Sequence, residues 1–310
     1  MPPSTRKVEI YAMLGVLSLL WGFAFVGIKE VVEEIAPSTL TILRFAIADI
    51  CLIVIMAFAP STRPRFERRD WWRVAVLAIT GVPMYHLSLN WGEQRTSASV
   101  ASLIVATAPV MVALLSAAIL RERTPVRRWL GIALAFGGVA VLASTDRSGG
   151  SSTSLVGIAV SVLAPVSWAI YVIVAKPLTE RASSVQVTAA GILVGSLTLL
   201  PFVSGRTLDD IGALSASGWG WMLLLGIGST VAGYFIFVWA LRRMDATTVS
   251  VFLYAVPVVA LLASWLLLDE NLGLPVAFAA VLVITGVSLA QQERRGPPAA
   301  TEEPLAAHRR

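Results

Sequence analysis

Almost the whole chain consists of long apolar runs that are separated by short polar segments. A helix needs about 20 apolar residues to cross a hydrocarbon core about 30 Å thick. The runs are too long and too uniformly apolar for the alternating strands of a membrane barrel. The first run also exceeds the apolar core of a signal peptide, so we expect it to be retained. The pattern predicts about ten spans, near 8–28, 38–59, 71–92, 97–120, 127–145, 155–176, 184–204, 216–241, 246–268 and 273–291.

Positive charges beside the spans predict the orientation, because cytoplasmic segments of membrane proteins are enriched in Lys and Arg. With the N-terminus inside, the inside segments hold sixteen of these residues and the outside segments hold four. We therefore expect both termini in the cytoplasm. The four outside residues are Lys29, Arg95, Arg147 and Arg206.

Composition agrees with a membrane protein and excludes several other classes. The 310 residues are 56% hydrophobic and 14% charged, whereas a soluble domain is about 25% charged. No Arg-rich stripe with interleaved aromatics appears, so we expect no nucleic-acid partner. Cys51 is the only cysteine, and His86 and His308 are the only histidines. Intrachain disulfides and the usual metal-ligand sets are thereby excluded, and we expect no metal and no cofactor.

One pattern occurs twice along the chain at a nearly constant offset of 147 or 148 positions. Since each unit contains five spans, an odd number, the second unit must enter the membrane from the opposite side. The halves are therefore predicted to be inverted repeats, which recur in secondary transporters with the site near mid-membrane between them. The matched pairs are Trp21/Trp168, Lys29/Lys176, Trp91/Trp239, Ala98/Ala246, Pro109/Pro257, Glu122/Glu270 and Gly138/Gly286.

The repeats define the domain organisation. We expect a first repeat at 8–145 and a second at 155–291, enclosing a central cavity. The Ser- and Gly-rich segment 146–154 is expected to be a polar linker. Residues 292–310 contain no apolar run, and we expect a disordered cytoplasmic tail. The sequence predicts an all-α membrane protein of ten transmembrane helices arranged as two inverted five-helix units.

Several local motifs resemble one transporter family. The chain contains Trp21-Gly22 and Arg44-Phe45 near its start, then Ala-Thr-Ala-Pro-Val at 106–110, Leu-Arg-Glu-Arg at 120–123 and Trp-Leu-Gly-Ile-Ala at 129–133. These motifs resemble the EamA domain of the drug/metabolite transporter (DMT) superfamily, over about residues 10–290. The resemblance implies a ten-helix transporter with cytoplasmic termini, and YddG-like exporters of aromatic and other neutral amino acids are the nearest subgroup. The second half departs from the pattern, because Gly191 aligns with Arg44.

Aromatic and polar side chains at membrane depth are the candidate lining of the cavity. Pro83, His86 and Asn90 share one face of the third span, and a polar stripe of this kind does not face lipid. His86 either binds a substrate carboxylate, exchanges a proton or is a neutral histidine between helices. Aromatic walls with polar tips suit zwitterions with apolar side chains, and ordinary helix packing is the alternative. The candidate lining residues are Tyr85, His86, Asn90, Trp168, Tyr171, Trp21, Tyr234, Trp239 and Tyr254.

Two charges lie inside the second span. By helix rise, Asp49 falls near the midplane and Arg44 about 10 Å below the outer end, from which Arg44 can snorkel to water. With His86, both are candidates for proton coupling or a polar network, because an intramembrane ionisable group is a functional candidate by default. An acid that serves packing alone is the alternative for Asp49.

Four prolines and two lysines complete the candidate set. Each intramembrane proline removes a backbone donor and bends its helix, so it is either a hinge or a fixed kink. The candidate hinges are Pro109, Pro257, Pro83 and Pro165. Lys29 and Lys176 are either cations beside a gate or interfacial anchors, and we favour anchors.

These features favour a secondary transporter of the inner (cell) membrane, working as one copy within the lipid bilayer. It is expected to export small organic metabolites, above all neutral or aromatic amino acids, by alternating access, either proton-coupled or downhill. An importer or a lipid-linked sugar translocator of the same superfamily is the alternative. A membrane-embedded enzyme is a remote alternative, because no cluster of acids, activated nucleophile or metal ligands lies at membrane depth.

Overall fold

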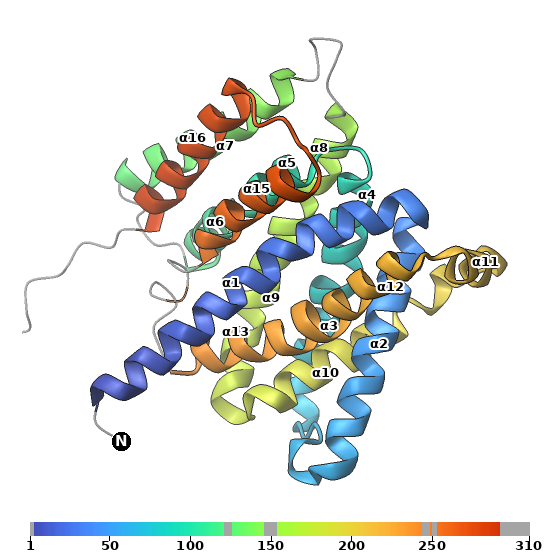
Figure 1. Cartoon of the computed structure of the whole chain (residues 1–310). Coiled ribbons are helices and arrows are strands. Elements are labelled where there is room, and N and C mark those ends of the chain that lie inside the picture. The colour runs from blue at the N-terminus through green and yellow to red at the C-terminus, as the bar shows by residue number, and fades with distance from the viewer. Residues whose placement is uncertain (1–2, 121–125, 146–153, 244–248, 250–252, 292–310) are drawn as a thin grey trace, which may run out of the picture.

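The computed structural model describes residues 3–120, 126–145, 154–243, 249 and 253–291, and within these ranges it contains helices and no strand (Figure 1). Six helical segments are long and apolar enough to cross a membrane, and four further apolar helices are shorter. The predicted all-α class and the ten apolar helices are thus confirmed. The tail 292–310, the linker 146–154 apart from Ser154, and two repeat positions, Glu122 and Ala246, lie outside the described residues.

The first repeat comprises α1 (Pro3–Glu34), α2 (Pro37–Phe58), α3 (Trp71–Ile79), η3 (Thr80–Leu87), α4 (Ser88–Glu93), α5 (Ala98–Val105), α6 (Ala108–Leu120) and α7 (Val126–Thr145). The second comprises α8 (Leu155–Ser161), α9 (Leu163–Arg181), α10 (Ser184–Leu197), α11 (Gly205–Ala213), α12 (Ala216–Leu223), η6 (Leu224–Ala232), α13 (Gly233–Leu241), α15 (Ala255–Leu267) and α16 (Leu274–Gln291). Short 3₁₀ turns occupy Pro60–Thr62, Arg68–Asp70 and Leu200–Phe202.

Contacts at helix ends show that the first span and its equivalent, the sixth span, run in opposite directions. Lys29, near the end of α1, donates from Nζ to the carbonyl of Thr96 at 3.2 Å. Ser154, at the start of α8, donates its N–H to the carbonyl of Arg95 at 2.8 Å. The end of α1 and the beginning of α8 therefore lie beside the same turn, as inverted repeats require. We call this side of the bundle the Lys29 end and the opposite side the Arg181 end.

Within the described residues, the third, fourth, sixth and eighth spans are interrupted, and the prolines explain two of the breaks. A proline lacks the N–H that bonds to residue i−4, and its ring clashes with that carbonyl. α5 ends at Val105, four residues before Pro109, and α8 ends at Ser161, four residues before Pro165. The third and eighth spans instead contain π-helical turns, η3 with Pro83 inside and η6 at the corresponding place in the second repeat.

The structure corrects one predicted helix boundary and adds one helix that was not predicted. α1 continues to Glu34, beyond the expected end of the first span at residue 28, so Lys29 lies inside the helix. The helix α11 was not predicted, because its nine residues contain too few apolar side chains for a span. It lies at one edge of the molecule (Figure 1). There Asp210 accepts hydrogen bonds from the Ala36 N–H and from Thr39 Oγ1.

Carboxylates join the two repeats at the Lys29 end. They accept hydrogen bonds from backbone N–H groups at the starts of helices, where the free N–H groups favour negative charge. Glu270 accepts from the N–H groups of Ala98 and Ser99 at 2.7 and 3.1 Å. Glu34 accepts from the Ser215 N–H at 2.7 Å. Burial raises the pKa of Asp210, but its bonds from Thr39 and Ala36, with Arg206 nearby, outweigh burial and hold that pKa below its ordinary value.

The Arg181 end has cross-repeat contacts of its own. Arg181 forms an ion pair with Asp70 at 2.8 Å, and Arg73 binds the same carboxylate oxygen. Gln186 donates from Nε2 to the carbonyl of Arg63 at 3.0 Å. Polar contacts between the repeats therefore exist on both sides of the bundle.

The matched glycines Gly138 and Gly286 allow α7 and α16 to pack closely, side by side at one edge of the molecule (Figure 1). A Cβ atom on Gly138 would lie 2.7 Å from Val283 Cγ2 and 2.9 Å from the Ala279 carbonyl oxygen. A Cβ atom on Gly286 would lie 2.5 Å from the Ala135 nitrogen. Small residues allow such close approach between membrane helices, which gives this pair of repeat positions a packing role.

Gly138→Ala is expected to destabilise the protein by about 1–3 kcal/mol, the usual range for overpacking. The matched control is Gly137→Ala, because a Cβ there meets nothing within 4 Å, so the better helix propensity of Ala makes that change neutral or stabilising. Thermal unfolding of both purified variants in detergent measures the difference. Equal melting temperatures would contradict the proposed packing role of Gly138.

Candidate functional site

A cavity lies between the repeats, with walls from helices of both halves. About 70 Å³ of it is open to the centres of water-sized molecules. Its wall is mostly apolar and includes Phe25, Ile28, Leu89, Pro109 and Pro257. Concave, mainly apolar sites with a few placed polar groups are the usual form of a small-molecule site.

Six of the nine aromatic and polar residues proposed from the sequence line this cavity. They come from α1, η3, α9, α13 and the turn before α15, so segments far apart in the chain meet here. Their role in binding stays a prediction. The six are Trp21, Tyr85, His86, Trp168, Tyr234 and Tyr254.

The other three proposed lining residues lie elsewhere. Asn90 is completely buried and donates from Nδ2 to Thr41 Oγ1 at 2.9 Å, so it joins α4 to α2. Tyr171 is buried behind Trp168, on which it stacks with ring centroids 4.8 Å apart. Trp239 lies nearer the Arg181 end, with the Arg243 guanidinium 4.3 Å from its ring centroid. Helical spacing placed these residues at the right depth but could not say which way each faces.

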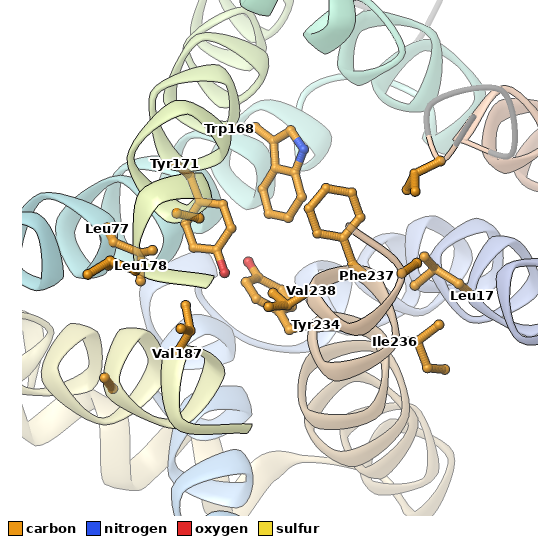
Figure 2. Close-up of a cluster of buried hydrophobic side chains, with 14 of the residues drawn as sticks. Leu17, Leu77, Trp168, Tyr171, Leu178, Val187, Tyr234, Ile236, Phe237 and Val238 are labelled. Carbon is orange, nitrogen blue, oxygen red and sulfur yellow. The ribbon is translucent and has the colours of Figure 1, made fainter. Parts of the chain in front are cut away.

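Equivalent residues of the two repeats meet at the cavity. Trp21 and Trp168 make an edge-to-face contact with centroids 5.4 Å apart. His86 and Tyr234, separated by 148 positions, lie 3.1 Å apart between Nε2 and Oη. Figure 2 shows the Trp168 ring between Tyr171 and Phe237. Such contacts place the pseudo-twofold axis of the repeats through this aromatic cluster.

Aromatic donors also satisfy the backbone of the two π-helical segments. Tyr234 Oη donates to the Gly81 carbonyl at 3.0 Å, and Trp21 Nε1 donates to the Ser229 carbonyl at 3.0 Å. Gly81 and Ser229 are equivalent positions at the offset of 148. An indole N–H buried at mid-membrane needs a polar partner, and for Trp21 a backbone carbonyl of the other repeat supplies it.

The hydrogen bonds around His86 assign its tautomer. A carbonyl only accepts, so the single Tyr234 hydroxyl proton is used at Gly81. His86 Nε2–H must then donate to Tyr234 Oη, which leaves Nδ1 without a proton in the neutral ring. Nδ1 has no partner among the described residues. His86 is 1% exposed, and it offers the cavity wall an imidazole held by Tyr234.

Arg44 does not snorkel to water, contrary to the expectation from its depth. It is 3% exposed and lines the cavity. Its Nε donates to Thr230 Oγ1 at 2.7 Å and its Nη2 to Ser229 Oγ at 3.0 Å. Two hydroxyl groups from η6, on the opposite repeat, turn the side chain inward. Sequence reasoning missed both partners, since their pairing depends on how α2 packs against η6.

The two intramembrane acids have different positions. Asp49 lies outside the cavity wall, and its Oδ1 is buried with no hydrogen-bond partner among the described residues. Glu93 was not singled out from the sequence, because it ends the third span and reads as a solvated residue. It is completely buried, and neither of its carboxylate oxygens has a partner among the described residues. One turn separates it from the cavity residue Leu89.

The two matched lysines have unequal surroundings. Lys29 has a 17% exposed side chain and binds the carbonyls of Glu93 and Thr96. This contact satisfies carbonyl groups at the end of α4, where a cation is favourable. Lys176 is exposed. An anchoring role therefore fits both, and neither lines the cavity.

Comparison with known proteins identifies the family. The model of the EamA-like transporter family matches residues 7–144 and again residues 155–291. The chain belongs to this family. An uncharacterised transporter of Archaeoglobus fulgidus is 35% identical over 284 residues, which cover 92% of this chain and 99% of that protein. The expected resemblance to the EamA domain is confirmed.

Two further comparisons add to this assignment. A protein of Streptantibioticus cattleyicolor, named "Probable terminal-alkyne amino-acid exporter", is 30% identical over 280 residues, 89% of this chain and 91% of its own. One chain of known crystal structure matches with a TM-score of 0.62 at 22% identity, covering 91% of this chain and 95% of that one. The second likeness supports the fold alone.

In this EamA-like transporter, the predicted hinge prolines take different positions. Pro109 and Pro257 both line the cavity, near the starts of α6 and α15. Pro83 lies inside η3, and Pro165 lies in the first turn of α9. All four therefore lie at or beside helix interruptions, as kinks should, and bending at these points stays a prediction.

Tyr234→Phe is expected to destabilise the protein by about 1–3 kcal/mol, because it leaves the His86 N–H and the Gly81 carbonyl buried without a partner. Tyr85→Phe is the matched control, since its hydroxyl makes no hydrogen bond within the described part of the chain. Thermal unfolding in detergent compares the two. The assigned network is wrong if both variants melt at the same temperature.

Proposed function

We propose that this multi-pass membrane transporter exports small organic metabolites, with neutral and aromatic amino acids as its preferred substrates. The observation that carries the proposal is the central cavity between the repeats, with an aromatic wall and few polar groups. Such a wall stacks on an apolar or aromatic side chain, while the few polar groups orient a charged head. The name of the Streptantibioticus relative gives independent support for amino acids and for export.

The position of the cavity and the contacts on both sides of it support alternating access as the proposed mechanism. In an inverted repeat, one unit rocks or bends against the other around a fixed site. The cross-repeat contacts of Glu270 at the Lys29 end and of Asp70 at the Arg181 end would then break and form in turn. The helix interruptions beside Pro109 and Pro257 are the proposed bending points.

Liposome transport tests this proposal. Purified protein in vesicles loaded with labelled phenylalanine or leucine is expected to give efflux well above that of protein-free vesicles. Trp168→Ala is expected to reduce the flux, and Trp129→Ala, which removes an exposed indole from α7, is the matched control.

Different results would favour other functions. Absence of flux for every neutral amino acid would refute the substrate assignment, and uptake of a lipid-linked sugar would favour the alternative translocator. Repeating the assay with and without an imposed proton gradient separates proton-coupled from downhill transport.

We also propose that the protein lies in the cell membrane as a functional single copy, with the Arg181 end and both termini in the cytoplasm. The support is the excess of Lys and Arg in the segments of that side. In a Cys51→Ala background, a cysteine replacing Asp209 is expected to react with an impermeant maleimide on intact cells. A cysteine replacing Glu180 is expected to react only after permeabilisation. The reverse labelling would overturn the orientation.

A further inference from the structure

Arg44 is a buried cation without an anionic partner. It is 3% exposed, and within the described residues no carboxylate oxygen lies within 4.0 Å of its guanidinium nitrogens. Both of its acceptors, Ser229 Oγ and Thr230 Oγ1, are neutral hydroxyls. Buried charges are normally paired, because an unpaired charge is costly in a low-dielectric interior. The charge of Arg44 is therefore not neutralised by a direct ion pair within the described residues.

The two hydroxyls orient the guanidinium and, within the described residues, use only two of its five N–H groups. Arginine has five N–H groups in a planar fork, and the bonds to Thr230 and Ser229 use one on Nε and one on Nη2. Thr230 Oγ1 is itself held, since it donates to the Leu225 carbonyl at 2.8 Å. The remaining N–H groups belong to a side chain in the cavity wall. Paired parallel N–H donors match the two oxygens of a carboxylate.

The rest of the cavity wall favours an anionic head beside an apolar body. No Asp or Glu lines the cavity within the described part of the chain. The buried acid Glu93 lies outside the wall, one turn beyond Leu89. Trp21, Phe25 and Trp168 offer apolar surface in the same cavity. A cation without an acidic group would meet Arg44 and be repelled.

This polar feature has no counterpart in the other repeat. The position equivalent to Arg44 is Gly191, and those equivalent to Ser229 and Thr230 are Gly81 and Val82. Symmetry therefore does not require the arginine or its hydroxyl partners for the scaffold. It also gives one such site for each chain.

We propose that Arg44, oriented by Ser229 and Thr230, binds the carboxylate of the transported solute and restricts transport to solutes that carry one. The inference rests on the proposed function in taking the central cavity as the substrate site. It adds a chemical requirement, which amino acids, hydroxy acids and keto acids meet and which amines, amides and uncharged sugars do not.

Binding of matched ligands to purified protein tests the requirement. Phenylalanine, phenylalaninamide, phenethylamine and 3-phenylpropanoate share one ring and differ in the charged head. Isothermal titration is expected to show binding of the two carboxylates, and binding of the amide and the amine weaker by about 10- to 100-fold, the range for hydrogen bonds to a charged group. Equal affinity for acid and amide in the wild type would overturn the proposal.

Variants separate binding from folding. Arg44→Gln is expected to bring the ratio of acid to amide affinity close to one, whereas Arg44→Lys keeps the charge without the fork and should give an intermediate ratio. Ser229→Ala removes one orienting hydroxyl. It should weaken binding of the acid but leave the acid bound more tightly than the amide. If Arg44 served packing alone, Arg44→Gln would lower the melting temperature and leave the ratio unchanged. If Arg44→Gln does not fold, Arg44→Lys carries the test, and a ratio equal to that of the wild type refutes the proposal.

The experiments distinguish a failure of the carboxylate site from a failure of the proposed amino-acid export. Tight binding of 3-phenylpropanoate through Arg44, together with no flux of any amino acid in liposomes, would retain the carboxylate site and refute the amino-acid assignment. Amino-acid flux of equal rate and equal acid preference in wild type and Arg44→Gln would retain the proposed function and refute the role of Arg44. No binding of either carboxylate would refute the carboxylate site.

Discussion

The architecture depends on the meeting of equivalent residues from the two repeats. Trp21 packs on Trp168, and His86 hydrogen-bonds Tyr234, each residue at its counterpart's position in the other half. In a structure with a twofold axis, only residues close to the axis contact their own equivalents. These contacts therefore fix where the axis crosses the bundle, and the cavity lies there because both halves supply its wall.

The same axis explains why helices are interrupted close to the cavity. A broken or widened helix leaves carbonyl groups without intrahelical partners, and inside a membrane these groups must be met by protein or water. Tyr234 donates a hydrogen bond to the carbonyl of Gly81, and Trp21 donates one to the equivalent carbonyl of Ser229. In both cases the donor and the acceptor belong to different repeats. The aromatic side chains thus have two roles, since their rings wall the cavity and their polar tips stabilise irregular backbone.

The sequence predicted the scaffold well because each of its signals is local or periodic. Span length, proline position and the matched residues such as Gly138 and Gly286 depend on chain-local physics or on duplication. The direction of individual side chains is different, because it depends on the packing of helices distant in sequence. Tyr171 and Asn90 have the expected depth but face neighbouring helices. Arg44 faces inward because η6 offers two hydroxyls there, and no spacing along α2 contains that information.

Duplication and specificity impose opposite demands on the residues around the axis. At positions that shape the fold, the same residue type in both repeats is favourable, since a glycine or proline that suits one repeat also suits its inverted copy. A solute such as an amino acid is not symmetric, however, so a symmetric cavity would present the same group to both of its ends. Recognition therefore requires residues that differ between the halves. Arg44, whose equivalent is Gly191, and His86, whose equivalent is Tyr234, are such differences, and Arg44 and His86 line the cavity. In the proposed mechanism, these differences allow a symmetric scaffold to distinguish the head of a solute from its body.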